Sequence, residues 1–369
     1  MESKRTINSS ALLLVCLSLV LGMGACGDDD NSTEDPGFDR STLLESLANG
    51  LIIPNFEALQ SSINALSTAT TAFNDNTTES NLTALRSAWQ QVATDFQHCS
   101  AFGFGPGNLP LGSFATVLGV FPVNEQGVEA NIVNPNFNLP ASFDRDIRGV
   151  YAVEYLIYGN NLTDANLIAA FDQNRKDHLV LLVGELKTTV DGIVTAWNGT
   201  YQQEFIADDG TASGSSISLL YNEFVKDYEN LKNFKIELPA GLTAGQPDSD
   251  PSIVEAFYSG ISRDLIVQHF QSARNIWAGQ SKSGQNLVGF QEYLQTVTGG
   301  TDLINTTLSA IATIDNAIAA LPQGRLSDNV DAAELATLRD ALQNNTANFK
   351  SSMSSLLGIS ITFNSGDGD

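Results

Sequence analysis

The spacing of apolar residues along the chain predicts a helical protein. From Ser41 onward apolar side chains recur every three or four residues, and runs that alternate with polar residues at every second position are few. A repeat near 3.6 residues places such side chains on one face of a helix. We expect these faces to be the buried seams of antiparallel helix bundles. The clearest apolar stripes lie within residues 83–96, 179–197, 304–321 and 335–356.

Clusters of glycine, proline and polar residues interrupt the helical pattern and predict where helices end. The break at residues 207–214 divides the chain into comparable halves. We therefore expect an all-α fold of two helix-bundle domains packed together, residues 39–206 and 207–369, which follow a lipoprotein signal and a flexible linker. The other predicted breaks lie at residues 103–112, 131–140, 238–251 and 299–300.

Residues 1–25 have the pattern of a lipoprotein signal peptide. Lys4 and Arg5 precede an apolar run at 11–21, and small residues follow up to Cys26. Cleavage of such a signal leaves a lipid on Cys26, which would tether the protein to a membrane. The run is too short for a membrane-spanning helix, which needs about 20 apolar residues. An ordinary signal peptide that leaves Cys26 as a free thiol is the alternative.

Residues 26–38 are acidic and polar, a composition that favours a flexible linker. The run at 28–30, three aspartates, resembles the surface-export tag of Bacteroidetes lipoproteins, although a simple acidic spacer has the same composition. We predict an outer-membrane lipoprotein of the cell envelope, held either at the periplasmic face or at the cell surface.

The charge of the chain narrows the classes of partner. There are 42 acidic and 18 basic residues, and the net charge is −24. Nucleic acid is disfavoured as a partner because phosphate contacts require clustered lysine and arginine. Cations are favoured, although solubility alone also explains an acidic surface. Once the signal is removed, Cys26 and Cys99 are the remaining cysteines, so stability is expected from the apolar core and not from an internal disulfide.

Common catalytic and metal-binding motifs are absent from the sequence. It contains no phosphate-binding loop, no His-Glu-x-x-His helix and no paired Cys-x-x-Cys. His98, His178 and His269 lack metal-type spacing, so each is expected to be structural or solvated. The ending 364–369 alternates carboxylates but is too short for a calcium loop, and we expect a frayed tail there.

The segment 144–159 carries the most specific chemistry. If it is helical, Arg148, Tyr151 and Glu154 share one face, with further tyrosines beside them. Gly149 costs roughly 1 kcal/mol of helix propensity against alanine and therefore suggests a close backbone approach. From these residues alone, an ordinary Arg–Glu helix face at a bundle interface is the alternative to a functional site.

The string 148–154, RGVYAVE, resembles the signature of imelysin-like proteins, which are grouped with peptidase family M75 and carry Gly-x-His-x-x-Glu. Tyr151 stands at the histidine position, while Gly149 and Glu154 are kept. Ser100 lies near the position of another family glutamate. The resemblance covers about residues 41–369. Further segments that agree in order and spacing lie at 53–56, 85–89, 104–106, 121–125, 215–216, 255–259 and 361–369.

The resemblance implies an exported helical protein of two bundles whose signature lies near their interface, often linked to iron uptake or iron-responsive expression. It makes Arg148, Gly149, Tyr151 and Glu154 candidate ligand- or metal-binding residues. The matched segments add further candidates, Glu125, Tyr258 and Ser259. A zinc peptidase needs neutral imidazole ligands, so Tyr151 weakens that activity. A phenolate with a carboxylate suits ferric iron, so iron remains the candidate cofactor or cargo.

Three hypotheses follow from the sequence. The first is a non-catalytic, lipid-anchored protein that binds a small ligand or metal ion between two bundles, in particular an iron species or its carrier. An outer-membrane receptor is the candidate partner of such a protein. The second is a metallopeptidase in which Glu154 is a ligand or general base. The third is an interaction module for a partner protein or polymer. Its aromatic anchors would be Tyr151, Tyr155, Tyr158 and Tyr258.

Overall fold

Helices make up nearly all of the regular structure, as the apolar spacing predicts. The computed structural model describes residues 37–134, 143–246 and 248–363. The predicted signal, Cys26, most of the linker, part of the break at 131–140 and the tail at 364–369 lie outside the described residues. The only strands in the part described are the short antiparallel pair β1 (Asn108–Leu109) and β2 (Gly112–Ser113).

Fifteen α-helices follow one another in the described residues, and short helical turns of other types extend or connect several of them. The helices of the first half are α1 (Arg40–Leu47), α2 (Ile53–Asp75), α3 (Glu79–Gln97), α4 (Phe114–Leu118), α5 (Glu125–Val133), α6 (Gly149–Tyr158), α7 (Asp164–Ala169), α8 (Gln173–Ala196) and α9 (Gln202–Ala207). Those of the second half are α10 (Ser216–Asn230), α11 (Ser262–Ala278), α12 (Phe290–Gln295), α13 (Gly300–Ala320), α14 (Ala333–Thr346) and α15 (Met353–Leu357).

Short turns of other helical types complete the regular structure of the described residues. Four are π-helical, a wider turn that inserts an extra residue. These are η1 (Ala48–Ile52), η5 (Trp197–Tyr201), η6 (Leu231–Glu237) and η9 (Ala347–Ser352). Four are 3₁₀ turns: η2 (Gly105–Gly107), η4 (Arg145–Ile147), η7 (Pro251–Ile253) and η8 (Leu326–Asp328).

Polar side chains at helix starts explain several boundaries. The Asp39 carboxylate accepts the backbone N–H of Thr42 at 3.1 Å, and α1 begins directly after it. Asp172 accepts the N–H of Arg175 at 3.0 Å at the start of α8. Such caps satisfy N–H groups that have no partner within the helix. At the other end of α11, Gly279 adopts the left-handed conformation typical of a C-terminal stop.

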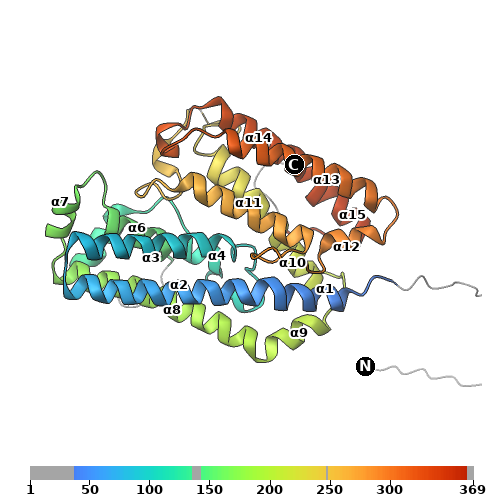
Figure 1. Ribbon diagram of the computed structural model, residues 1–369, viewed down its shortest axis with the longest axis horizontal. Coiled ribbons are helices and arrows are strands. Elements are labelled where there is room, and N and C mark those ends of the chain that lie inside the picture. Colours follow the sequence, from blue (N-terminus) through green and yellow to red (C-terminus); the bar gives the residue numbers. More distant parts are fainter. Residues whose placement is uncertain (1–36, 135–142, 247, 364–369) are drawn as a thin grey trace, which may run out of the picture. The chain divides into compact units, whose positions relative to one another are not determined.

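The long helices pack in two neighbouring groups (Figure 1). In the first half, α2 lies against α3 and α8, and α6 packs on both α3 and α8. In the second half, α13 packs against α14, while α10 and α11 lie together. Contacts between α11 and α3 and between α1 and α10 join the groups, and residues from Phe38 onward form one compact unit. The domain boundary at 206/207 therefore stays a prediction.

The predicted stripes agree with the observed helices, with one exception, and so do the predicted breaks at 103–112, 207–214, 238–251 and 299–300. The stripes at 83–96, 179–197, 304–321 and 335–356 fall on α3, α8, α13 and the α14–α15 region, and their apolar residues are mostly buried. Leu308, which the spacing places in the third stripe, is instead 46% exposed. Leu308 lies one turn from the buried residues Ile304 and Ile311, at the edge of the buried face of α13. A helix has 3.6 residues per turn, so residues spaced at three and four do not all stay on the centre of one face.

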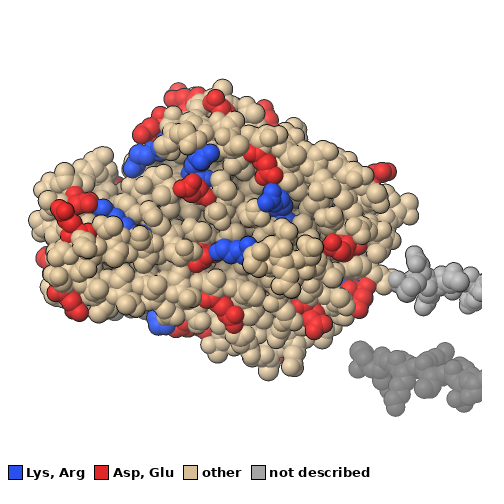
Figure 2. Space-filling model, in the orientation of Figure 1, with Lys and Arg blue, Asp and Glu red and all other residues tan. Residues whose placement is uncertain are grey.

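No helix in the described ranges combines the length and apolarity needed to cross a membrane. Cys99 is buried and has no disulfide partner. The face shown in Figure 2 carries acidic side chains spread over several helices, with a few basic ones between them.

Candidate functional site

The signature helix α6 begins at Gly149, so Arg148 lies just before it and not on its face. Arg148 is extended, with φ −142° and ψ −179°, and Gly149 has φ +82°. A Cβ on Gly149 would lie 2.1 Å from the backbone oxygen of Leu118. The close approach suggested by the sequence is confirmed. The placement of Arg148 on the helical face is wrong, because the positive φ at Gly149 turns the chain before the helix starts.

Arg148 is directed toward α8. Its Nη1 lies 2.9 Å from Oε1 of Glu185, and both side chains are buried. An ion pair removed from water in this way fixes two elements relative to each other. Arg148 therefore joins the start of α6 to α8 and does not line the cavity described below.

Tyr151 forms a buried polar cluster with residues from three other segments. Its hydroxyl donates to Oε1 of Glu255, which also accepts from Nε2 of Gln97 at 3.2 Å. The Lys235 ammonium lies 2.8 Å from the same Glu255 oxygen and also donates to Oε1 of Gln97. We call Gln97, Tyr151, Lys235 and Glu255 the signature cluster. Its charges balance, since one ammonium faces one carboxylate.

Burial sets the protonation of the signature tyrosine and glutamate. Desolvation and the neighbouring Glu255 carboxylate raise the pKa of Tyr151 well above its usual range. Glu154 is 1% exposed, and its Oε1 accepts the backbone N–H of Ser259 at 2.7 Å. Burial raises the pKa of Glu154 from 4.5 to about 7, against the opposing effect of the Ser259 hydrogen bond. Tyr151 is therefore a neutral donor, and Glu154 titrates near neutrality.

The remaining predicted residues meet beside this cluster. Glu125 accepts from the hydroxyl of Tyr258 at 3.0 Å and from the amide of Asn160 at 2.9 Å. The ring of Tyr258 lies 5.2 Å from the ring of Tyr155. The structure thus brings Glu125 at the start of α5, and Tyr258 and Ser259 in the loop that follows η7, close to α6. Their role in binding stays a prediction.

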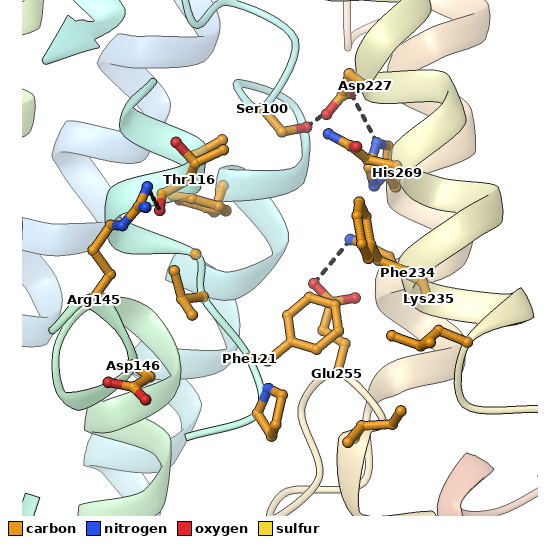
Figure 3. A pocket seen from close by; sticks show the side chains of 18 of the residues that line it. Ser100, Thr116, Phe121, Arg145, Asp146, Asp227, Phe234, Lys235, Glu255 and His269 are labelled. Atoms are coloured by element: carbon orange, nitrogen blue, oxygen red, sulfur yellow. Dashed lines mark hydrogen bonds and ion pairs between the residues drawn. The ribbon is translucent and has the colours of Figure 1, made fainter. Parts of the chain in front are cut away.

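A cavity of about 610 Å³ opens beside the signature cluster, between segments of the two halves (Figure 3). Gln97, Lys235 and Glu255 line it, and Tyr151 lies behind them against the ring of Phe121, with centroids 5.5 Å apart. Much of the wall is aromatic or aliphatic. These apolar lining residues include Phe96, Phe121, Phe143, Phe234, Leu238 and Ile253.

A second polar group lies at another end of the same cavity (Figure 3). The Asp227 carboxylate accepts from the hydroxyl of Ser100 at 3.0 Å and lies 2.8 Å from Nε2 of His269. All three residues are buried. The carboxylate stands between serine and histidine, so histidine is not placed to take the serine proton as a nucleophilic triad requires.

Sequence reasoning missed most of the residues that line the cavity. Gln97, Lys235, Asp227 and His269 come from α3, η6, α10 and α11, and no local motif joins them. One signal was present at Lys235, which lies seven residues after Tyr228 and therefore on the apolar face of the helical pattern. It lies with Phe234 on the π-helical turn η6, and such turns are frequent at functional sites.

The signature residues do not fit a metal ion. Oε1 of Glu255 is taken by the Lys235 ammonium and by the Tyr151 hydroxyl, which is a donor and not a phenolate. One oxygen of this cluster's carboxylate, Oε2, is left without a partner, which is too few ligands for a metal ion. In the described ranges, no group of three or more histidine, cysteine, aspartate or glutamate side chains is placed to hold a metal. The phenolate–carboxylate pair that the sequence suggested for ferric iron therefore has no support in this geometry.

Comparison with known proteins places this arrangement in a family. The model of the imelysin family, peptidase M75, matches residues 52–353, which include every member of the signature cluster. The chain belongs to the imelysin family. Iron-regulated protein A of Synechococcus elongatus is 21% identical over 301 residues, which cover 78% of this chain and 77% of that protein.

Two solved structures of imelysin type share the fold. A protein described as an iron-regulated protein A precursor from Parabacteroides distasonis superposes with a TM-score of 0.73 at 17% identity, over 86% of this chain and 95% of the other. An imelysin-like protein from Psychrobacter arcticum gives a TM-score of 0.70 at 20% identity, over 88% and 97%. These likenesses establish the all-α imelysin fold.

Proposed function

We propose that this chain is a non-catalytic binding protein that takes a small organic ligand into the cavity beside the signature cluster. The observation that carries the proposal is the buried Glu255 carboxylate, which lines the cavity and whose Oε2 has no hydrogen-bond partner among the described residues. A buried acceptor without a partner costs about 1–3 kcal/mol, which a ligand donor would recover. Apolar walls with a few convergent polar groups are typical of ligand sites.

Iron uptake is the proposed role. A relative and a structural neighbour both carry the name iron-regulated protein A. Because the signature cluster offers too few free carboxylate oxygens for a bare metal ion, the proposed cargo is iron in an organic carrier. The predicted lipid on Cys26 would hold the protein at the outer membrane, where a receptor could hand over such a carrier.

Calorimetric titration tests this role. Ferric benzohydroxamate, an aromatic iron complex, should bind the purified chain, whereas zinc ions should not. Phe234→Ala, at the exposed rim of the cavity, should weaken the complex about fivefold or more. Leu308→Ala, which removes an equally accessible apolar side chain on α13, should leave it unchanged. Absence of binding to the ferric complex, or tighter binding of zinc, would reject the iron-carrier role.

The anchor is tested separately by expressing the chain with Cys26 intact and as Cys26→Ser. Lipidation predicts that the unchanged chain sediments with outer membranes and that the variant is released into the soluble envelope fraction. Protease treatment of intact cells then distinguishes a surface from a periplasmic location. Equal release of both forms would exclude the lipid anchor.

The structure gives less support to the other two hypotheses. A peptidase would need a metal ligand set or an activated water, and the Glu154 oxygen is already bonded to the Ser259 N–H. An interaction module would need accessible anchors. Of the four named above, Tyr151 and Tyr155 are only 1% and 9% exposed, and Tyr158 and Tyr258 are partly buried. The peptidase hypothesis would be restored if the chain cleaved unfolded protein substrates and a chelator blocked this cleavage.

A further inference from the structure

Two residues that line the cavity each carry a buried polar atom without a hydrogen-bond partner among the described residues. One is Oε2 of Glu255, and the other is on His269, which is 2% exposed and whose Nδ1 has no hydrogen-bond partner among the described residues. Nε2 of His269 lies 2.8 Å from the Asp227 carboxylate, so in the neutral ring the proton lies on Nε2 and Nδ1 is an acceptor. Both open positions therefore call for donors on the ligand.

The charged residues that line the cavity favour a ligand whose hydrogen-bond donor is a cation. Four carboxylates line it, Asp144, Asp146, Asp227 and Glu255, against two basic side chains, Arg145 and Lys235. The Lys235 ammonium is already placed on Glu255 Oε1. An ammonium group gains from such an excess of negative charge, whereas a carboxylate loses.

Aromatic residues define the rest of the ligand. Phe234 and Phe143 line the cavity yet are 52% and 80% exposed, which is unusual for phenylalanine in a soluble protein. Phe234 lies directly beside Lys235 on η6, so the apolar rim and the charged cluster are presented by one turn (Figure 3). A flat apolar body would cover Phe234 and bring its head group to the buried acceptors.

From these observations we infer that the cavity binds an amphipathic aromatic amine, with the ammonium donating to Glu255 Oε2 and the ring against Phe234. The inference rests on the proposed ligand-binding function and names the ligand class of the same site. It requires no metal, so it can fail or succeed independently of the iron role.

Three indole probes with the same ring separate the head groups. Tryptamine carries an ammonium, tryptophol a neutral hydroxyl and indole-3-propionate a carboxylate. Calorimetry or ligand-observed NMR on the purified chain should rank tryptamine first, tryptophol second and indole-3-propionate at least about tenfold weaker than tryptamine. An equal or better affinity for the carboxylate would overturn the inference.

Variants then locate the binding. Glu255→Gln should weaken tryptamine about tenfold and leave tryptophol within about twofold, because only the charge is removed. Phe234→Ala should weaken all three probes alike, while Leu308→Ala should change none. If Glu255→Gln fails to fold, the exposed Phe234→Ala still decides the matter: tryptamine affinity that survives it places the amine elsewhere and refutes the site. Tryptamine binding without binding of ferric benzohydroxamate would refute the iron role alone.

Discussion

Glu154 is a buried carboxyl without a paired cation in the contacts that the structure gives it. Its oxygen is held by the Ser259 N–H, and the nearby Glu255 carboxylate adds repulsion to the cost of burial. The signature position that the family keeps as an acid is thus half-neutral at physiological pH in this chain. Glu154 therefore binds and releases a proton near neutral pH, independently of any ligand in the cavity.

Glu154 should make the protein less stable as the pH rises. The native state keeps its proton up to about pH 7, whereas the unfolded chain releases it near 4.5, so in this window the native state binds more protons. Stability is then fully present below the lower value and is lost as the pH rises through the upper one. Glu154→Gln removes this loss. Between pH 5 and pH 8 the free energy of unfolding of the variant should therefore rise by about 3 kcal/mol relative to that of the unchanged chain.

Urea unfolding at both pH values measures the difference. Glu45→Gln, an exposed position on α1, is the control for the loss of one negative charge. Equal gains in the two variants would show that overall charge, and not the burial of Glu154, causes the effect.

Gly149 should not tolerate alanine. With φ +82° and the Leu118 oxygen 2.1 Å from a built Cβ, both the backbone and the space exclude a side chain. We expect Gly149→Ala to lower the free energy of unfolding by about 3 kcal/mol. Gly184→Ala, in the middle of α8 with nothing within 4 Å of a built Cβ, should instead stabilise by up to about 1 kcal/mol. Similar effects at both positions would contradict the close approach.

At the scale of elements, apolar periodicity predicts the helices because each long helix buries one face. It does not predict which polar groups meet. Lys235 lies seven residues after the buried Tyr228, so the repeat places it on the buried face, but nothing in the spacing indicates that its partner there is Glu255. The bond from Tyr151 to Glu255 joins residues 104 positions apart, and no local spacing encodes it. The signature residues were therefore predictable through the resemblance, but the cavity that they support was not.

The Arg148–Glu185 pair should control how α6 is held on α8. Arg148→Ala leaves the Glu185 carboxylate buried, where burial already raises its pKa against the effect of Arg148, and should cost about 3–5 kcal/mol. The double variant with Glu185→Leu removes both charges and should recover most of that loss. A double-mutant cycle by urea unfolding gives the coupling. Additive losses would mean that the ion pair does not join the two helices.

At the scale of the whole molecule, acid acts on the fold in two opposite ways. With a net charge of −24, protonation of surface carboxylates relieves repulsion and favours the compact state. Two buried histidines act in the opposite direction, because acid destabilises the fold through them. Burial lowers the pKa of His98, which links the end of α3 to Gln268, and of His178 on α8, each from 6.5 to about 4.

Below pH 6.5, the two buried histidines should determine how stability changes with pH once salt screens the repulsion between surface charges. The unfolded chain binds protons at these two sites between about pH 6.5 and pH 4 while the native state does not, so stability falls as the pH falls. When the pH is lowered from 7 to 5, the free energy of unfolding of His178→Leu should therefore fall by about 2 kcal/mol less than that of the unchanged chain. His98→Gln should behave in the same way. Salt separates the two effects, because 0.5 M salt screens surface repulsion but not desolvation, given a Debye length of roughly 10 Å already at 0.1 M. A histidine effect that disappears in high salt would show that these rings titrate as surface groups, and that the acid response of the fold comes from its net charge alone.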